Sequence, residues 1–118
     1  MSTADLAVGA AFDVDPVTGV LSVGGAWVVH EVESLRQALV DLLPRLPAAR
    51  VTVDASAIVE MDGAGVQLLV ALGHALRAGG HDPVLQGGAA RVLTAARVLG
   101  ACDDLRCCGM VIDVTEGR

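Results

Sequence analysis

The chain has 118 residues, 53% of them hydrophobic, which is enough for one domain with an apolar core and too little for two. Aromatic residues make up only 2%, so platforms for stacking nucleic-acid bases are not expected. All eight basic residues are arginine and the formal net charge is -6, which opposes binding to a phosphate backbone.

Two periodicities alternate along the chain and predict its secondary structure. Strict alternation of apolar and polar residues, as in the stretch RVTVDAS, indicates a strand, and apolar residues at three- and four-residue steps indicate a helix. In chain order, the sequence predicts strands at 11–15 and 20–29, a helix at 31–43, a strand at 50–56, a helix at 63–78, a strand at 82–86, a helix at 89–99 and a final strand within 109–114.

The ends of these elements carry the residues that stop them. Pro44 ends the first helix because proline restricts the residue before it, Gly79 and Gly80 end the second, and Gly100 ends the last. The resulting order of strands and helices predicts an α/β fold, with a small mixed sheet and helices packed mainly on one face. A single domain is expected over residues 1–118.

The cellular location of the protein is predicted from its N-terminal residues and from the length of its apolar segments. Asp5 stands where a signal peptide would need basic residues, so no secretion signal is expected. The longest apolar helical stretch, residues 62–77, is shorter than the roughly 20 residues of a membrane span and contains Gln67 and His74. A cytoplasmic protein without direct membrane insertion is therefore predicted.

The DGAG stretch, residues 62–65, places an acid and two glycines directly before the second helix. Asp62 is interpreted as an N-cap whose carboxylate accepts the backbone N–H of Gly65, with a role as general base as the alternative. A dinucleotide fingerprint would need a third glycine where the chain has Leu68, and a P-loop would need a lysine. Neither phosphate-binding motif is present.

The sequence contains no pattern that is typical of a metal site or of a catalytic site. The three histidines are scattered, and Cys102, Cys107 and Cys108 lack the C-x-x-C spacing of a zinc site, so no metal and no cofactor are expected. The odd number of cysteines, crowded into one segment, favours reduced thiols. Neither a nucleophile elbow nor a pair of carboxylates in a pocket-like setting is apparent, so an enzyme is not expected.

The second helix is apolar over a wider surface than one side of a small sheet can cover. Packing against neighbouring helices and contact with a partner protein are the two explanations, and the sequence leaves both open. Gly63 and Gly65 agree with a partner surface, because small residues let another protein approach the backbone closely.

With these motifs in place, the chain resembles the STAS domain, named for sulfate transporters and anti-sigma factor antagonists. The resemblance is carried by VTVDASAIVEMDGAGVQLLVAL, residues 51–72, and by ARVLTAARVLGACDDL, residues 90–105, and it covers residues 12–106. It implies a four- or five-stranded sheet with three to four helices mainly on one face. It also implies a domain without catalysis of its own that works by docking onto a partner.

Carried over residue by residue, the resemblance places Asp54 as the acid that ends the third strand and Asp62 as the acid before the family's phosphosite. Gly65 and Val66 occupy the Gly-Leu positions of the family motif. Gly63 and Ala64 stand where the family carries Ser or Thr, so no phosphosite is expected. This variant of the motif is similar to the one in STAS proteins from chemotaxis gene clusters and, more distantly, to the one in the STAS subunit of phospholipid-transport ABC systems.

The resemblance implies a regulatory, protein-binding domain that is similar to an anti-sigma factor antagonist and lacks the phosphorylatable hydroxyl. The partner-binding residues it suggests are Asp62, Gly63, Ala64, Gly65, Val66 and Gln67. An anti-sigma or histidine-kinase-like ATPase, a chemotaxis component and a transporter ATPase are the alternative partners, and a homodimer is left open. A module that binds a nucleotide or lipid, or an accessory subunit of an ABC lipid transporter, is the alternative function.

Overall fold

The computed structural model describes residues 10–15, 17–46, 50–100 and 110–112. These residues form five strands, three α-helices and one 3-10 helix. In chain order the elements are β1 (Ala10–Asp15), β2 (Val20–Trp27), α1 (Val32–Leu42), η2 (Leu43–Arg45), β3 (Arg50–Met61), α2 (Gly63–Ala78), β4 (Asp82–Gln86), α3 (Ala89–Val98) and β5 (Val111–Ile112). Each α-helix agrees with its predicted range to within one residue at either end.

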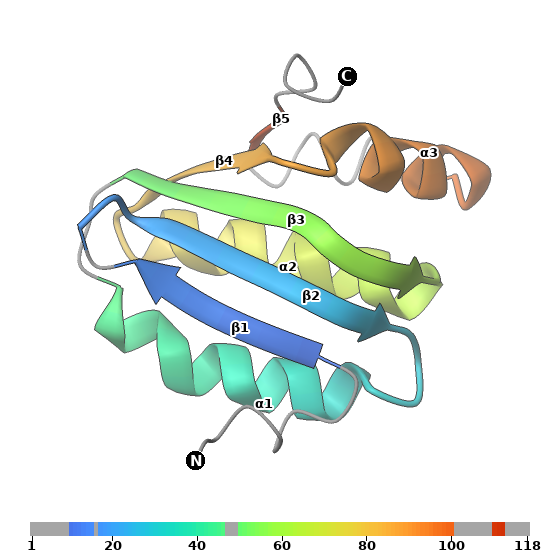
Figure 1. Cartoon of the computed structure of the whole chain (residues 1–118), viewed down its shortest axis with the longest axis horizontal. Coiled ribbons are helices and arrows are strands. Elements are labelled where there is room, and N and C mark those ends of the chain that lie inside the picture. Colours follow the sequence, from blue (N-terminus) through green and yellow to red (C-terminus); the bar gives the residue numbers. More distant parts are fainter. Residues whose placement is uncertain (1–9, 16, 47–49, 101–109, 113–118) are drawn as a thin grey trace.

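The strands form one mixed sheet in the order β1-β2-β3-β4-β5 (Figure 1). β1 is antiparallel to β2, whereas β2 with β3, β3 with β4 and β4 with β5 are parallel pairs. A parallel pair needs a crossover connection, and α1 and α2 supply the first two of them. The predicted α/β fold with a mixed sheet is confirmed.

β1 and β2 form a β-hairpin, and Asp15 fixes the turn between them. The Oδ1 atom of Asp15 accepts hydrogen bonds from the backbone N–H of Val17 at 2.9 Å and of Thr18 at 3.3 Å. These two donors lower the pKa of the Asp15 carboxyl, that of Val17 most. Gly19 closes the turn with φ of 74°, a conformation that residues with a Cβ rarely adopt.

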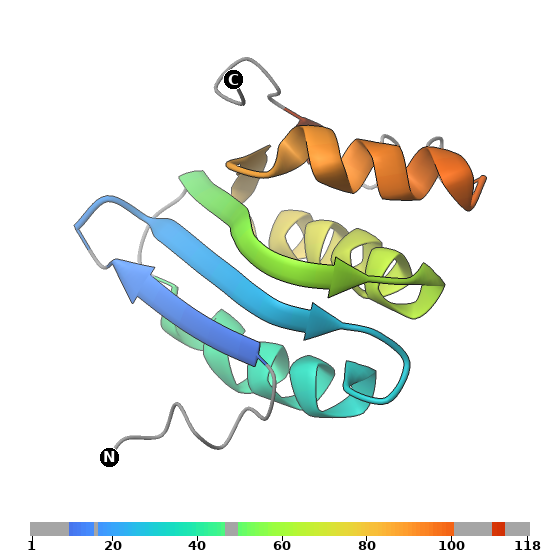
Figure 2. The ribbon, with the colours of Figure 1, turned by 45° about the vertical axis from the view of Figure 1, so that its right-hand side comes forward.

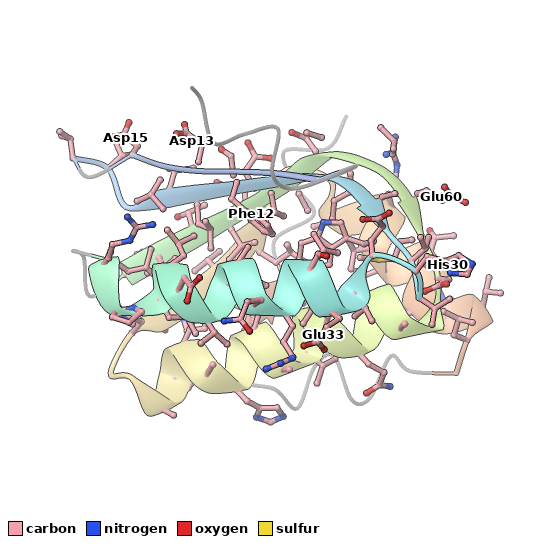
Figure 3. The ribbon with its side chains drawn as sticks, turned by 90° about the horizontal axis from the view of Figure 1, so that it is seen from below. Phe12, Asp13, Asp15, His30, Glu33 and Glu60 are labelled. Carbon is pink, nitrogen blue, oxygen red and sulfur yellow. The ribbon has the colours of Figure 1, made fainter. Side chains whose placement is uncertain are left out.

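The helices are not spread evenly around the sheet. α1 and α2 lie on one face, toward which Phe12 points, while Asp13 and Asp15 point away from these helices on the opposite face (Figure 3). α3 packs beside the C-terminal half of β3 rather than beneath the middle of the sheet (Figure 2). The alternation of apolar and acidic residues in β1 thus separates a core face from a solvent face.

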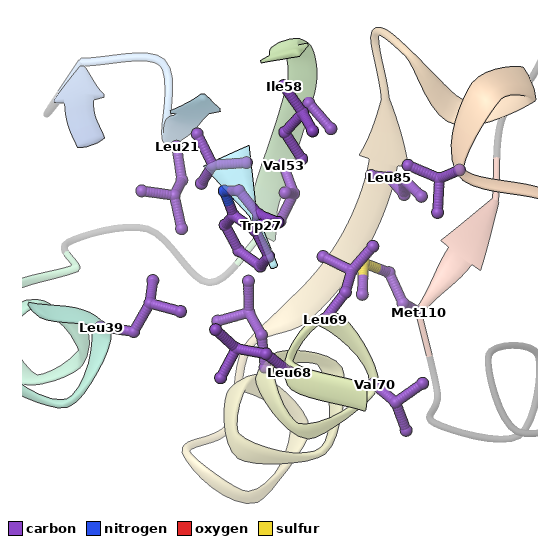
Figure 4. Packing of buried hydrophobic residues seen from close by; sticks show 14 of the residues in the cluster. Leu21, Trp27, Leu39, Val53, Ile58, Leu68, Leu69, Val70, Leu85 and Met110 are labelled. Carbon is purple, nitrogen blue, oxygen red and sulfur yellow. The ribbon is translucent and has the colours of Figure 1, made fainter. Parts of the chain in front are cut away.

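The core fills the space between the sheet and α2, where aliphatic side chains replace the missing aromatic residues (Figure 4). Trp27, Leu69 and Leu85, from β2, α2 and β4, are each 0% exposed. Burial of each such side chain contributes about 1.5–3 kcal/mol. Phe12 meets Trp27 edge to face, with ring centroids 6.2 Å apart. The only two aromatic residues of the chain therefore contact each other.

The third strand is longer than its sequence predicts. The strand expected at 50–56 continues to Met61, because β2 runs alongside it as far as the pair Trp27 and Met61. Its last residues do not alternate between buried and exposed, and two register shifts interrupt the pairing with β2. The strand therefore ends directly at Asp62, where α2 is capped. β2 itself ends at Trp27, two residues before the predicted end at position 29.

Candidate functional site

The start of α2 is built around the carboxylate of Asp62. This residue joins β3 to the helix. The Oδ1 atom of Asp62 accepts the backbone N–H of Ala64 at 2.9 Å and of Gly65 at 3.2 Å. Asp62 itself has extended backbone angles, with φ of -117° and ψ of -168°, as an N-cap residue requires. The predicted N-cap is confirmed, including its bond to Gly65.

The second carboxylate oxygen of Asp62 reaches a segment far away in the sequence. Its Oδ2 atom accepts the N–H of Val29 at 3.0 Å, from the connection between β2 and α1. The backbone N–H of Asp62 in turn donates to the carbonyl of Trp27 at 3.1 Å. Asp62 thus connects the end of β2 to the beginning of α2. Sequence periodicity does not predict this contact, because the two segments are far apart in the sequence.

These bonds also fix the charge of Asp62. The Val29 N–H lowers the pKa of the Asp62 carboxyl most, the N–H groups of Gly65 and Ala64 lower it further, and partial burial opposes them. The carboxylate is therefore charged at neutral pH, with both oxygens holding backbone donors. A general base must be free to take a proton from a reacting group, so the geometry favours a structural role for Asp62.

The two glycines of the DGAG stretch have different roles. A Cβ atom at Gly65 would lie 1.9 Å from the carbonyl oxygen of Trp27, so only glycine lets α2 start this close to β2. A Cβ atom at Gly63 would have nothing within 4 Å. Gly65 is therefore needed by the fold, whereas Gly63 leaves an open space at the surface of the loop.

Three comparisons relate the chain to known proteins. The family model described as "Mlab, STAS domain" matches residues 10–110. The chain belongs to the STAS domain family. Among solved structures, the unphosphorylated form of the anti-sigma factor antagonist SpoIIAA is similar, with 19% identity, a TM-score of 0.57 and 90% of each chain covered. At this identity the likeness concerns the fold. A search of curated proteins finds no match.

The predicted partner-binding residues of this STAS domain differ in accessibility. Gln67 is exposed, while Asp62, Gly63 and Ala64 are half-buried. Gly65 and Val66 are buried, and Val66 is 0% exposed, so they can act only by holding the loop from beneath. Asp54, expected at the end of the third strand, lies within β3 and is its last residue paired with β4.

The wide apolar surface of α2 is covered by the STAS domain itself. α2 contacts α1 and α3 as well as the sheet, and its large apolar side chains are buried. Its exposed positions are Gln67, Ala71, His74, Arg77 and Ala78. Of the two explanations that the sequence leaves open, packing within the fold is the observed one. This surface therefore gives no support to a docking function.

Four of the seven large apolar side chains that are exposed in the described residues belong to segments at one end of the molecule. The connection from β2 to α1, the end of β3, the start of α2 and the end of α3 all lie at this end, which is on the right in Figures 1 and 2. These segments carry Val29, Val59, Val98 and Leu99, which are 59%, 76%, 80% and 48% exposed. Sequence periodicity did not reveal this shared location, because the four residues come from three segments that are distant in the sequence.

Other candidate chemistry is limited within the described residues. They contain no group of three or more His, Cys, Asp or Glu side chains placed to hold a metal ion, and no helix long and apolar enough to cross a membrane. The three cysteines at positions 102, 107 and 108 lie outside the described residues. The prediction that they hold no metal therefore stays a prediction.

Proposed function

We propose that this STAS domain is a non-enzymatic regulator that binds another protein reversibly in the cytoplasm, as an anti-sigma factor antagonist does. The observation that carries the proposal is the start of α2, residues 62–67, where Asp62 caps the first turn of the helix; we call these residues the docking loop. Hydrogen bonds to Asp62 and the close approach of Gly65 to Trp27 fix its backbone, while Gly63, Ala64 and Gln67 stay accessible. A preformed, accessible loop loses little conformational entropy when a partner binds.

The exposed apolar side chains at the same end of the molecule also support a protein-binding surface around the start of α2. The exposed side chains of Val29 and Val59 belong to segments that join the loop, since Val29 donates to Asp62 and β3 runs directly into it. Exposed apolar groups beside polar ones are typical of surfaces that bind other proteins. The family and the SpoIIAA-like fold are consistent with a protein partner, for which an ATPase of an anti-sigma factor or transporter, or a chemotaxis component, is the candidate.

The loop has no acceptor for a phosphoryl group. Residues 62–67 contain no Ser, Thr or Tyr, and a protein kinase of the usual type transfers phosphate to a hydroxyl oxygen. Gly63 and Ala64 offer only hydrogen and a methyl group at the positions where the family resemblance places the hydroxyls. Binding at this loop is therefore constitutive or controlled by the partner.

A charge at Ala64 tests whether this loop is the docking site. The wild-type chain is used to capture its partner from the native cell, and the purified partner is then titrated with wild type, Ala64→Glu and Ala64→Ser. Ala64→Glu should keep the melting temperature, because an acid is favourable near a helix N-terminus. It should weaken binding by roughly a hundredfold or more, because the charge is desolvated and unpaired in the interface.

Ala64→Ser is the matched control, since it adds an oxygen without a charge and should bind like wild type. A well-folded Ala64→Glu variant that binds as tightly as wild type would show that the loop is not the docking site. Thermal shifts with nucleotides and fatty acids test the alternative function, since a ligand that binds the folded state raises its stability. A saturable shift would favour a small-molecule binding module.

A further inference from the structure

A pocket of about 120 Å³ lies between α3 and the C-terminal half of β3, which run side by side (Figure 2). Ala55 and Ile58 from β3 and Val92 from α3 give it a buried apolar lining, each 2% exposed or less. Met61 and Ala95, which are half-buried, add to its apolar walls. The floor of this pocket, which we call the β3–α3 pocket, therefore belongs to the apolar core.

The backbone of β3 beside the pocket already has its hydrogen-bond partners. The N–H of Ala55 donates to the carbonyl of Gly87 at 2.9 Å. The carbonyl of Ile58 accepts from the Nη1 atom of Arg91. These bonds and the helix beside them close this edge of the strand, so an added strand finds no free groups there. An occupant of the pocket inserts a side chain and does not pair its backbone with β3.

The size of the pocket limits the occupant further. Pockets that enclose a whole drug-sized ligand have volumes of roughly 300–1,000 Å³, and an apolar cavity of roughly 150 Å³ holds one benzene molecule. The β3–α3 pocket, at about 120 Å³, has room for about one aliphatic side chain. A free small molecule or a lipid chain would remain mostly outside it, whereas a side chain of a docked protein is held in place by the contacts around it.

The charges at the rim favour an uncharged occupant. Glu60 from β3 and Arg91 from α3 both line the pocket and are both exposed. Their formal charges are opposite, so the rim attracts neither an anion nor a cation as a whole. A charge among the buried apolar side chains of the lining would also lose its hydration without a partner, which is costly. An aliphatic side chain matches both the lining and the neutral rim.

The pocket lies close to the docking loop. Met61 lines it and directly precedes Asp62, and Val59, 76% exposed, also belongs to its lining. Ala64 follows Met61 by three positions, so their Cα atoms are separated by at most about 11 Å. A protein interface of standard size covers about 800 Å² on each partner. One partner protein can therefore contact the docking loop and fill the pocket at the same time.

We infer that the β3–α3 pocket receives one aliphatic side chain, of the size of valine, leucine or isoleucine, from the protein that this domain binds. The inference rests on the proposed function and adds the chemistry by which the partner is recognised. In protein interfaces a few side chains, seated in desolvated pockets, carry most of the binding energy. The partner's aliphatic side chain is such an anchor, and the exposed Val59 covers it at the rim.

Filling the pocket from within tests the inference. Ala95→Leu adds an isopropyl group at the pocket wall and should exclude the anchor. We expect it to weaken the purified partner, captured with the wild-type chain, by roughly tenfold to a hundredfold, the effect of losing one buried aliphatic side chain. Ala90→Leu is the matched control, because this exposed residue of the same helix does not line the pocket, and it should bind like wild type. Ala95→Met, with a more flexible chain, is the second variant if Ala95→Leu does not fold.

Substitutions in the partner identify the anchor. Each exposed aliphatic residue of the partner is replaced by alanine, and every variant is titrated against wild type and Ala95→Leu. One replacement should weaken binding to wild type by a similar factor and have little further effect on Ala95→Leu, since both changes remove the same contact. A partner without such a residue would overturn the inference.

The outcomes separate the inference from the proposed function. A folded Ala95→Leu or Ala95→Met variant that binds the partner as tightly as wild type would overturn the inference, whatever Ala64→Glu does. Weaker binding by Ala95→Leu but not by Ala64→Glu would support the pocket and contradict the docking loop. Saturable thermal stabilisation by decanoate that Ala95→Leu abolishes would assign the pocket to a lipid, and a concentration-dependent dimer that Ala95→Leu disrupts would assign it to a second copy of the chain. Either result would overturn the inference.

Discussion

Replacing Gly65 by alanine tests whether the close approach of α2 to β2 holds the loop in place. The added Cβ would lie 1.9 Å from the Trp27 carbonyl oxygen and 2.8 Å from its carbonyl carbon, whereas Cβ contacts below 3.0 Å are essentially never seen. The helix start must therefore move away by about 1 Å. Both contacts are with backbone atoms, so no side-chain rotation relieves them.

The expected cost follows from two opposing effects. Overpacking costs about 1–3 kcal/mol, and moving α2 also stretches the hydrogen bonds at Asp62, which contribute about 1 kcal/mol each. Alanine in a helix offsets this by about 1 kcal/mol relative to glycine. We expect Gly65→Ala to lower the free energy of unfolding by about 3 kcal/mol, measured by urea denaturation with circular dichroism.

Gly63→Ala is the control, because it makes the same chemical change in the same turn of the helix. Its Cβ would have nothing within 4 Å, so the substitution should be neutral or stabilising by up to about 1 kcal/mol. Equal unfolding free energies for the two variants would refute the reasoning that the contact with Trp27 makes Gly65 necessary.

Three further predictions concern the groups around this helix start and the cysteines. Asp62→Asn should remove a pH-dependent part of the stability: the folded-state pKa of Asp62 is lowered, so its contribution is complete above the unfolded value of 3.8 and is lost as the pH falls through the folded pKa. Urea denaturation at pH 7 and at successively lower pH should show a steeper loss for wild type than for Asp62→Asn, and parallel losses would contradict this. Trp27→Phe should cost about 2 kcal/mol in the same assay, since it leaves a cavity and removes the 3.1 Å bond from the indole N–H to the Gly24 carbonyl, and a change below about 0.5 kcal/mol would count against that role. Elemental analysis should find no zinc in the purified chain, and about one zinc per chain would show that the cysteines bind metal.

The sequence predicted those elements whose limits are chemically marked. α2 begins after Asp62 and ends before Gly79 as expected, because a capping acid and a glycine act locally. The continuation of β3 to Met61 was missed, since its last residues are placed by pairing with β2 and not by their own alternation. The local sequence pattern therefore predicts the type of an element and the position of its capped ends. It does not predict the length of a strand whose last residues are held only by pairing with a neighbouring strand.

The candidate site was predictable only in its local part. The bond between Asp62 and Gly65 spans one helical turn, so the motif alone indicates it. The bond from Val29 to Asp62 spans 33 positions and depends on the sheet that brings β2 beside β3. The bond from Arg91 to the Ile58 carbonyl likewise depends on where α3 lies against β3, which periodicity does not encode.

The bond between Val29 and Asp62 makes one amide proton a reporter of the whole loop. Val29 is 59% exposed and lies outside any helix or strand, so its amide would otherwise exchange with solvent within a short time. Its N–H is instead held by the capping carboxylate, and it exchanges only when that contact opens. Hydrogen exchange at Val29 therefore measures how often the contact between Asp62 and the β2–α1 connection opens, without any substitution in the loop and before a partner is known.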